Sequence, residues 1–108
     1  MMGVAYHGLT GGRVSVIIDG ESYPLDPRLD LIDHGCESPS RFGWGHHGAG
    51  PSQLALAILA DFTRDDAFAR AHHMEFKRKC IGLLPSLRAF TVDADEVGSF
   101  VSAVAGGQ

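Results

Sequence analysis

The sequence predicts a single α+β domain over residues 1–108, in which a small antiparallel sheet packs against about three helices. Three observations lead to this fold class. The first quarter of the chain alternates as β-strands do, a long apolar helical pattern begins near residue 51, and the predicted order of elements is β-β-β-α-α-β-α. That order lacks the regular strand–helix alternation of a parallel sheet. A chain of 108 residues fills one core and not two.

The N-terminal strands are predicted to form a three-stranded meander. Residues 4–9 and 13–19 are separated by Thr-Gly-Gly, which suits a tight reversal. Asp19-Gly20 is the strongest hairpin signal in the chain, because both positions tolerate positive φ. The third strand is expected at 21–25.

A loop and a central helix are predicted next. Residues 26–41 read mostly as loop, with a short edge strand expected at 29–32. The first helix is expected to have Gly50 as its cap and Pro51 as its first residue, where a missing N–H costs nothing. Apolar residues cover most of its circumference, so we expect it to lie at the centre of the fold.

The second helix is predicted from Asp65 to about Leu84. Acidic residues occupy its first turn and basic residues its last, as the helix dipole favours. Its expected core stripe consists of Ala69, His73, Phe76, Cys80 and Leu83. His73 is therefore expected to be a half-buried packing residue with one hydrogen bond.

A fourth strand is predicted at 87–92, followed by a third helix. Asp93 and Glu96 have the spacing of a capping box. The amphipathic face of this helix is expected to consist of Val97, Phe100, Val101 and Val104.

Composition narrows the class of function. The chain is 44% hydrophobic and 20% charged, with a net charge of −4, which favours a soluble protein over one that binds nucleic acid or anionic membrane. No signal-peptide pattern is found at the start, and the longest apolar run, 54–60, is too short to span a bilayer. We expect a cytoplasmic protein in which Cys36 and Cys80 are free thiols.

The densest cluster of unusual residues is the glycine-rich loop, defined here as residues 42–50. Its glycines permit backbone conformations closed to other residues, and it leads into a helix N-terminus that can hold an anion. The alternative is that these glycines only fold Trp44 under the sheet and start the helix. In the binding interpretation the tryptophan and the histidines are exposed, and the candidate binding residues are Trp44, His46, His47, Gly48, Gly50, Ser52 and Gln53.

No metal site or cofactor is expected. His46 and His47 are adjacent and point to opposite sides, so they do not serve one metal. His72 with Glu75 lacks a third ligand, and Glu75 is expected to pair with Lys79 instead. The cluster formed by Asp30, Asp33, His34 and Cys36 matches no metal-binding spacing and reads as solvated loop.

The order of motifs resembles a family of small bacterial, archaeal and phage proteins known only as a domain of unknown function. The general pattern rests on Tyr6, Gly8, Pro24, Leu25, Phe76, Lys77, Leu83, Leu84 and Pro85. The specific part is F-x-W-G-x-x-G-x-G-P-x-Q-L-A, matched by Phe42, Trp44, Gly45, Gly48, Gly50, Pro51, Gln53, Leu54 and Ala55. The resemblance implies a cytoplasmic, accessory or mobile-element context and brings no activity.

Three functions stay open from the sequence. We expect a non-enzymatic protein that binds a protein partner, as an accessory or modulator from a phage or other mobile element that acts on a host protein complex. This follows from the small size and from the lack of a catalytic constellation. One alternative is a small-ligand or anion-binding domain built on the glycine-rich loop. The other is nucleic-acid binding through the basic second helix, which the net negative charge does not favour.

Overall fold

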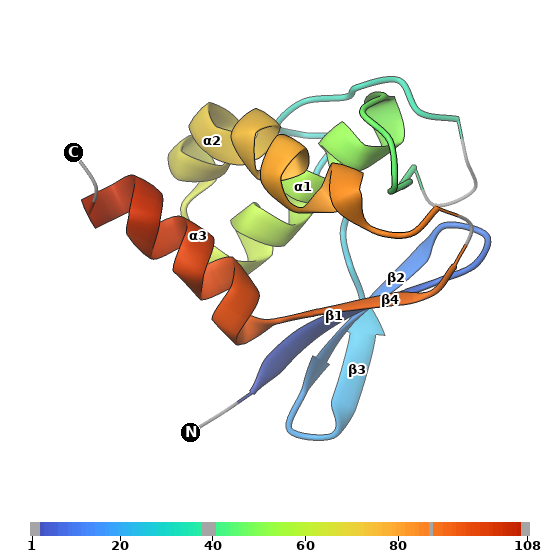
Figure 1. The fold of residues 1–108 in the computed structure, drawn as a ribbon, viewed down its shortest axis with the longest axis horizontal. Helices are drawn as coiled ribbons and strands as arrows, with labels where there is room; N and C mark the ends of the chain where they lie inside the picture. The colour runs from blue at the N-terminus through green and yellow to red at the C-terminus, as the bar shows by residue number, and fades with distance from the viewer. Residues whose placement is uncertain (1–2, 38–40, 87, 107–108) are drawn as a thin grey trace.

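The computed structural model describes residues 3–37, 41–86 and 88–106 and confirms the α+β fold (Figure 1). The antiparallel sheet has the order β3-β2-β1-β4. Its strands are β1 (Val4–Leu9), β2 (Arg13–Ile18), β3 (Glu21–Pro24) and β4 (Phe90–Asp93). The helices are α1 (Ala49–Thr63), α2 (Asp66–Lys79) and α3 (Ala94–Gly106), with a 3₁₀ turn, η1 (Ile81–Leu83), after α2.

The sheet is the predicted meander with the last strand added beside the first. β4 pairs with the free edge of β1, so the final strand completes a sheet that the first three began. One face carries the neighbouring side chains of Tyr6, Val16 and Val92, all fully buried. The helices gather on one side of the sheet (Figure 1). The fourth strand was predicted to begin at Leu87, which lies outside the described residues, and is observed from Phe90.

Asp61, near the end of α1, joins the helix to the inner face of the sheet. Its carboxylate accepts hydrogen bonds from the hydroxyls of Tyr6, at 2.7 Å, and Tyr23, at 2.9 Å. Burial, together with the adjacent Asp61 carboxylate, raises the pKa of Tyr6 and keeps its hydroxyl a donor.

Helix α1 lies at the centre, as predicted, because every residue from Gly50 to Ala60 is buried. The prediction of its start was wrong by two residues: Gly48 is the cap and Ala49 the first helical residue. Pro51 still falls within the first turn, whose N–H groups have no partner inside the helix. Gly50 therefore lies inside the helix, where an added side chain would meet the backbone of Gly43.

The edge strand predicted at 29–32 is wrong, since this segment forms a turn and irregular chain. Backbone groups in and beside this segment bond to the side chain of Gln53 on α1 and not to a neighbouring strand. The Gln53 side-chain amide donates to the carbonyl oxygens of Pro27, at 2.6 Å, and Ile32, at 2.9 Å, and its oxygen accepts from the N–H of His34 at 2.9 Å. A single buried glutamine thus replaces a neighbouring strand.

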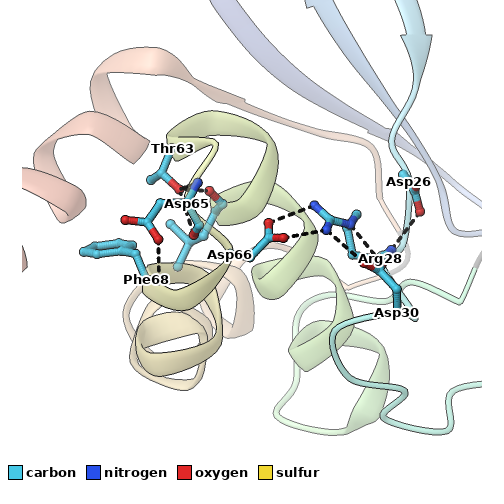
Figure 2. Close-up of polar contacts among 8 residues, drawn as sticks. Asp26, Arg28, Asp30, Thr63, Asp65, Asp66 and Phe68 are labelled. Carbon is cyan, nitrogen blue, oxygen red and sulfur yellow. Dashed lines mark hydrogen bonds and ion pairs between the residues drawn. The ribbon is translucent and has the colours of Figure 1, made fainter.

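Arg28 fastens the same segment to α2 (Figure 2). Its guanidinium contacts the carboxylates of Asp30 and Asp66, each at 3.0 Å, and its backbone N–H donates to Asp26. The hydrogen bonds from Arg28 lower the pKa of Asp30. Because Arg28 has a left-handed φ of 56°, the chain turns here and cannot continue as a strand.

Helix α2 is shorter than predicted. Asp65 caps it by accepting from the Phe68 N–H at 3.0 Å, also drawn in Figure 2, and the helix ends at Lys79. The core stripe is confirmed for its buried members, Ala69, His73 and Phe76, whereas Cys80 is only half-buried. Leu83 was wrongly placed in the core and is 71% exposed, because η1 breaks the helical periodicity before it.

Helix α3 begins with the predicted capping box. The Glu96 N–H donates to Asp93 at 3.0 Å, and the Asp93 N–H donates to the Glu96 carboxylate at 3.2 Å. Val97 is the buried residue of this helix, and Phe100, Val101 and Val104 are partly exposed. Both cysteines are free, as predicted. In the described part of the chain, no helix is long and apolar enough to cross a membrane.

Candidate functional site

The glycine-rich loop places its tryptophan inside the protein. The Trp44 side chain is 6% exposed, its ring N–H donates to the Arg88 carbonyl oxygen at 2.8 Å, and it packs edge-on against Phe90 with ring centroids 4.7 Å apart. Trp44 is therefore buried, as in the alternative interpretation of this loop, and not exposed as in the binding interpretation. An indole with its N–H satisfied internally serves the core.

Two glycines of the loop are required by close approaches. Gly45 has a φ of +80°, and its N–H donates to the Ile81 carbonyl oxygen at 3.1 Å. A Cβ on Gly50 would lie 2.7 Å from the backbone nitrogen of Gly43 and 3.2 Å from the Cys36 sulfur. The loop and α1 are thus pressed together backbone to backbone. These glycines have a structural role.

The polar residues at the start of α1 also bond within the protein. Ser52 and Gln53 were among the candidate binding residues. The Ser52 hydroxyl instead donates to the Gly48 carbonyl oxygen at 3.1 Å, and Gln53 is fully buried with the three partners described above.

The exposed candidates of the loop are His46, His47 and Gly48. The Gly48 N–H donates to His46 Nδ1 at 3.2 Å, and the His47 carbonyl oxygen accepts from the buried ammonium of Lys77 at 3.1 Å. His46 also lines a cavity of about 350 Å³ between the loop and the β1–β2 turn, with Phe42, Gly43 and Trp44 on the same side. Of the seven candidate residues, three are therefore exposed on one short segment.

A larger concavity lies between α2 and α3 and was not predicted from the sequence. This α2–α3 groove has a volume of about 780 Å³. Phe100 and Val104, both partly exposed, provide its apolar lining beside the fully buried Phe76, and the two phenylalanine rings have centroids 5.0 Å apart. The half-buried Cys80 also lines it. Burial raises the pKa of Cys80 to about 11, so at neutral pH it is a thiol and not a nucleophilic thiolate.

Charged residues surround this apolar lining. Glu75 and Lys79 stand on the α2 side and form an ion pair at 2.9 Å, which confirms the predicted i, i+4 pair. Asp95 and Glu96 stand on the α3 side, both exposed. Three carboxylates against one ammonium give the groove a negative rim. The sequence signal for it was the apolar content of 94–105, which exceeds what one contact stripe needs.

The other predicted clusters do not assemble into a metal site. Among the residues with described positions, no group of three or more His, Cys, Asp or Glu side chains is arranged to hold a metal ion. His72 packs against Phe68 with ring centroids 4.6 Å apart. Asp33 contacts Arg41 at 3.6 Å.

His34, from the predicted cluster of Asp30, Asp33, His34 and Cys36, has a partner that the sequence did not suggest. Its ring nitrogen Nε2 lies 3.0 Å from Nε2 of His73 on α2. His73 is buried, at 3% exposure, more deeply than predicted. Contact between residues so far apart in the chain leaves no periodic signal in the sequence.

These features define a small α+β protein whose internal polar network is used for folding and which has a helix–helix groove with an acidic rim. The chain belongs to a family of unknown function, DUF6166, whose model matches residues 6–103. No curated protein and no solved structure gives a significant match to it.

Proposed function

We propose that this protein is a non-enzymatic protein-binding module that receives an apolar segment with basic flanks from a partner protein in the α2–α3 groove. The observation that carries the proposal is the apolar lining of the partly exposed Phe100 and Val104, which lie beside the buried Phe76 inside an acidic rim. Helix pairs commonly bind an amphipathic helix in this way, with apolar side chains filling the groove.

The packing of α3 supports an unfilled binding surface. The α3 sequence is strongly apolar, yet Val97 is its buried residue and its remaining apolar side chains stay partly or fully exposed. Exposed contiguous apolar surface with a polar rim is typical of interaction sites. The rim carboxylates Glu75, Asp95 and Glu96 favour Lys or Arg on the partner and disfavour acidic segments.

Two neighbouring exposed residues of α3 provide a matched test. Ala103 lines the groove, whereas Ser102 faces a separate surface. Ala103→Arg and Ser102→Arg change the net charge equally, but only the first obstructs the groove. The probe is a synthetic helical peptide with leucines at i, i+4 and i+7 and lysines at its flanks, and its affinity is measured by calorimetry. We expect wild type and Ser102→Arg to bind alike, and Ala103→Arg to bind at least about tenfold more weakly, a loss of about 1.4 kcal/mol.

A second peptide with the same leucines and glutamates at its flanks tests the charge argument. It is expected to bind more weakly than the lysine peptide. Equal affinity of the lysine peptide for the two arginine variants would place binding outside the groove. No binding of the lysine peptide would contradict the proposed class of partner.

The nucleic-acid alternative receives less support. Of the basic residues near the end of α2, Lys77 is buried and donates to the His47 carbonyl oxygen, and Lys79 pairs with Glu75. A steep fall of affinity for DNA or RNA with rising salt would support this alternative.

The further expectation is that the partner belongs to a host complex met by a phage or mobile element. Phage or mobile-element genes beside the gene for this protein would support it.

The anion-binding alternative at the glycine-rich loop is tested through Trp44, the sole tryptophan. Because Trp44 is buried, we expect blue-shifted emission that turns red on thermal unfolding. Phosphate, nucleotides and simple carboxylates are expected to leave the midpoint unchanged. A ligand at a hundred times its Kd adds about 2.7 kcal/mol to the free energy of unfolding, which raises the midpoint of a domain this small by roughly ten degrees. A rise of this size that is lost in Gly48→Val would favour the anion-binding alternative.

A further inference from the structure

The most unusual contact in the described structure is the pair of imidazoles from His34 and His73. The two Nε2 atoms are 3.0 Å apart, a hydrogen-bond distance, and the ring centroids are 5.1 Å apart. His34 belongs to the irregular segment 29–37, and His73 to the buried face of α2. The pair therefore joins a segment that has no regular secondary structure to the helical layer.

The backbone around His73 assigns the protons. His73 Nδ1 lies 3.1 Å from the carbonyl oxygen of Ala69 and 3.0 Å from that of Arg70. Carbonyl oxygens only accept, so Nδ1 of His73 carries the hydrogen. In the neutral ring its Nε2 is then an acceptor, and the hydrogen between the two rings belongs to Nε2 of His34. Nδ1 of His34 keeps a lone pair.

Counting protons shows when this contact fails. One added proton goes to Nδ1 of His34 and leaves the N–H···N bond intact. The second must go to Nε2 of His73, where it meets the N–H of His34 between two positive rings 3.0 Å apart. The doubly protonated pair cannot keep this contact, and like charges at this distance titrate as a coupled unit.

The surrounding charges also oppose protonation. Burial lowers the pKa of both rings, and the Lys77 ammonium on α2 lowers them further. On the 29–37 segment, Asp33 acts in the opposite direction on His34, and the backbone hydrogen bonds of His73 raise its pKa. From α1, the neutral side chain of Gln53 bonds the backbone of His34 and adds no charge. The net effect is a lowered pKa for both imidazole rings.

We propose that His34 and His73 form a proton-operated latch, which holds the 29–37 segment against α2 at neutral pH and releases it at mildly acidic pH. Histidines released into water regain a pKa of about 6.5, so below this pH the open form carries two more protons than the neutral closed pair, and one more than a closed pair that already has a proton on Nδ1 of His34. The ratio of open to closed molecules then rises up to a hundredfold per pH unit, against tenfold for a single site. This device goes beyond the proposed protein binding and does not depend on it.

The test follows the two imidazoles and the backbone amides of 31–36 by NMR between pH 8 and pH 5. At pH 8 we expect the Nδ1–H form of His73 and the Nε2–H form of His34. On acidification the amides should change in one transition that takes up close to two protons. Two rings that titrate separately while the amides of 31–36 stay unchanged would overturn the latch, as would a pair that stays neutral until the whole protein unfolds.

Two glutamine variants sharpen the test. His34→Gln keeps a donor toward Nε2 of His73 but cannot take a proton, so the transition should take up one proton and the pH dependence should fall to tenfold per unit. His72→Gln, on the same helix but outside the pair, should keep the two-proton slope. An unchanged slope in His34→Gln would overturn the proposal. A wild-type transition that disappears on adding EDTA would instead assign the pair to a metal ion.

Discussion

Gly50→Ala is expected to destabilise the protein by about 2–4 kcal/mol, although alanine is the better helix former. The added Cβ would lie 2.7 Å from the nitrogen and 2.9 Å from the Cα of Gly43. Backbone atoms cannot move aside as a flexible side chain does, so α1 and the glycine-rich loop must separate. Thermal unfolding should show a midpoint lower by more than about ten degrees.

Gly98→Ala is the matched control for this prediction. Gly98 is also helical, but a Cβ there meets only Phe62, at an ordinary contact distance of 3.7 Å. The intrinsic preference for alanine then dominates, and we expect a gain of roughly 0.5–1 kcal/mol. If both variants shift the midpoint in the same direction, the packing of α1 against Gly43 does not explain Gly50.

Gln53→Ala is the second large effect, with an expected loss of about 3 kcal/mol or more. It leaves the carbonyl oxygens of Pro27 and Ile32 and the N–H of His34 without their partner, and it opens a cavity at a fully buried position. Each buried polar group left unsatisfied costs about 1–3 kcal/mol. Chemical denaturation measures the loss.

Ser52→Ala, one residue earlier, removes a hydroxyl that donates one hydrogen bond of 3.1 Å to the carbonyl oxygen of Gly48, the cap residue of the same helix. We expect it to cost about 1 kcal/mol or less, because that carbonyl oxygen also accepts from the Ser52 N–H. Similar losses in the two variants would mean that Gln53 does not organise residues 27–34.

Elements with a strong local signal were predictable. The Asp19-Gly20 turn and the Asp93–Glu96 capping box depend on neighbours in the chain, and both formed as expected. The burial of α1 from Gly50 to Ala60 followed from apolar residues on all its sides. Boundaries were less predictable, since the early start of α1 and the early end of α2 depend on packing with distant segments.

The candidate site was less predictable than the fold, for a physical reason. An irregular segment held by side chains carries no periodicity, so the bonds of Gln53 to residues 27–34 leave no pattern in the sequence. The same holds for His34 with His73 and for Arg28 with Asp66. Trp44 illustrates the opposite error, because a conspicuous loop residue suggested exposure while its ring completes the core beside Phe90.

The place of β4 beside β1 has a consequence for the order of folding. Residues 5–8 pair with 90–93, so β1 gains its second neighbour only from a segment that follows both α1 and α2 in the chain. During synthesis the meander must wait with the β1 edge unpaired until both helices have been made, and the final pairing joins segments that are far apart in the sequence. Such non-local pairing slows folding. We expect the sheet to become protected from hydrogen exchange in a single late step, with β1 and β4 protected together.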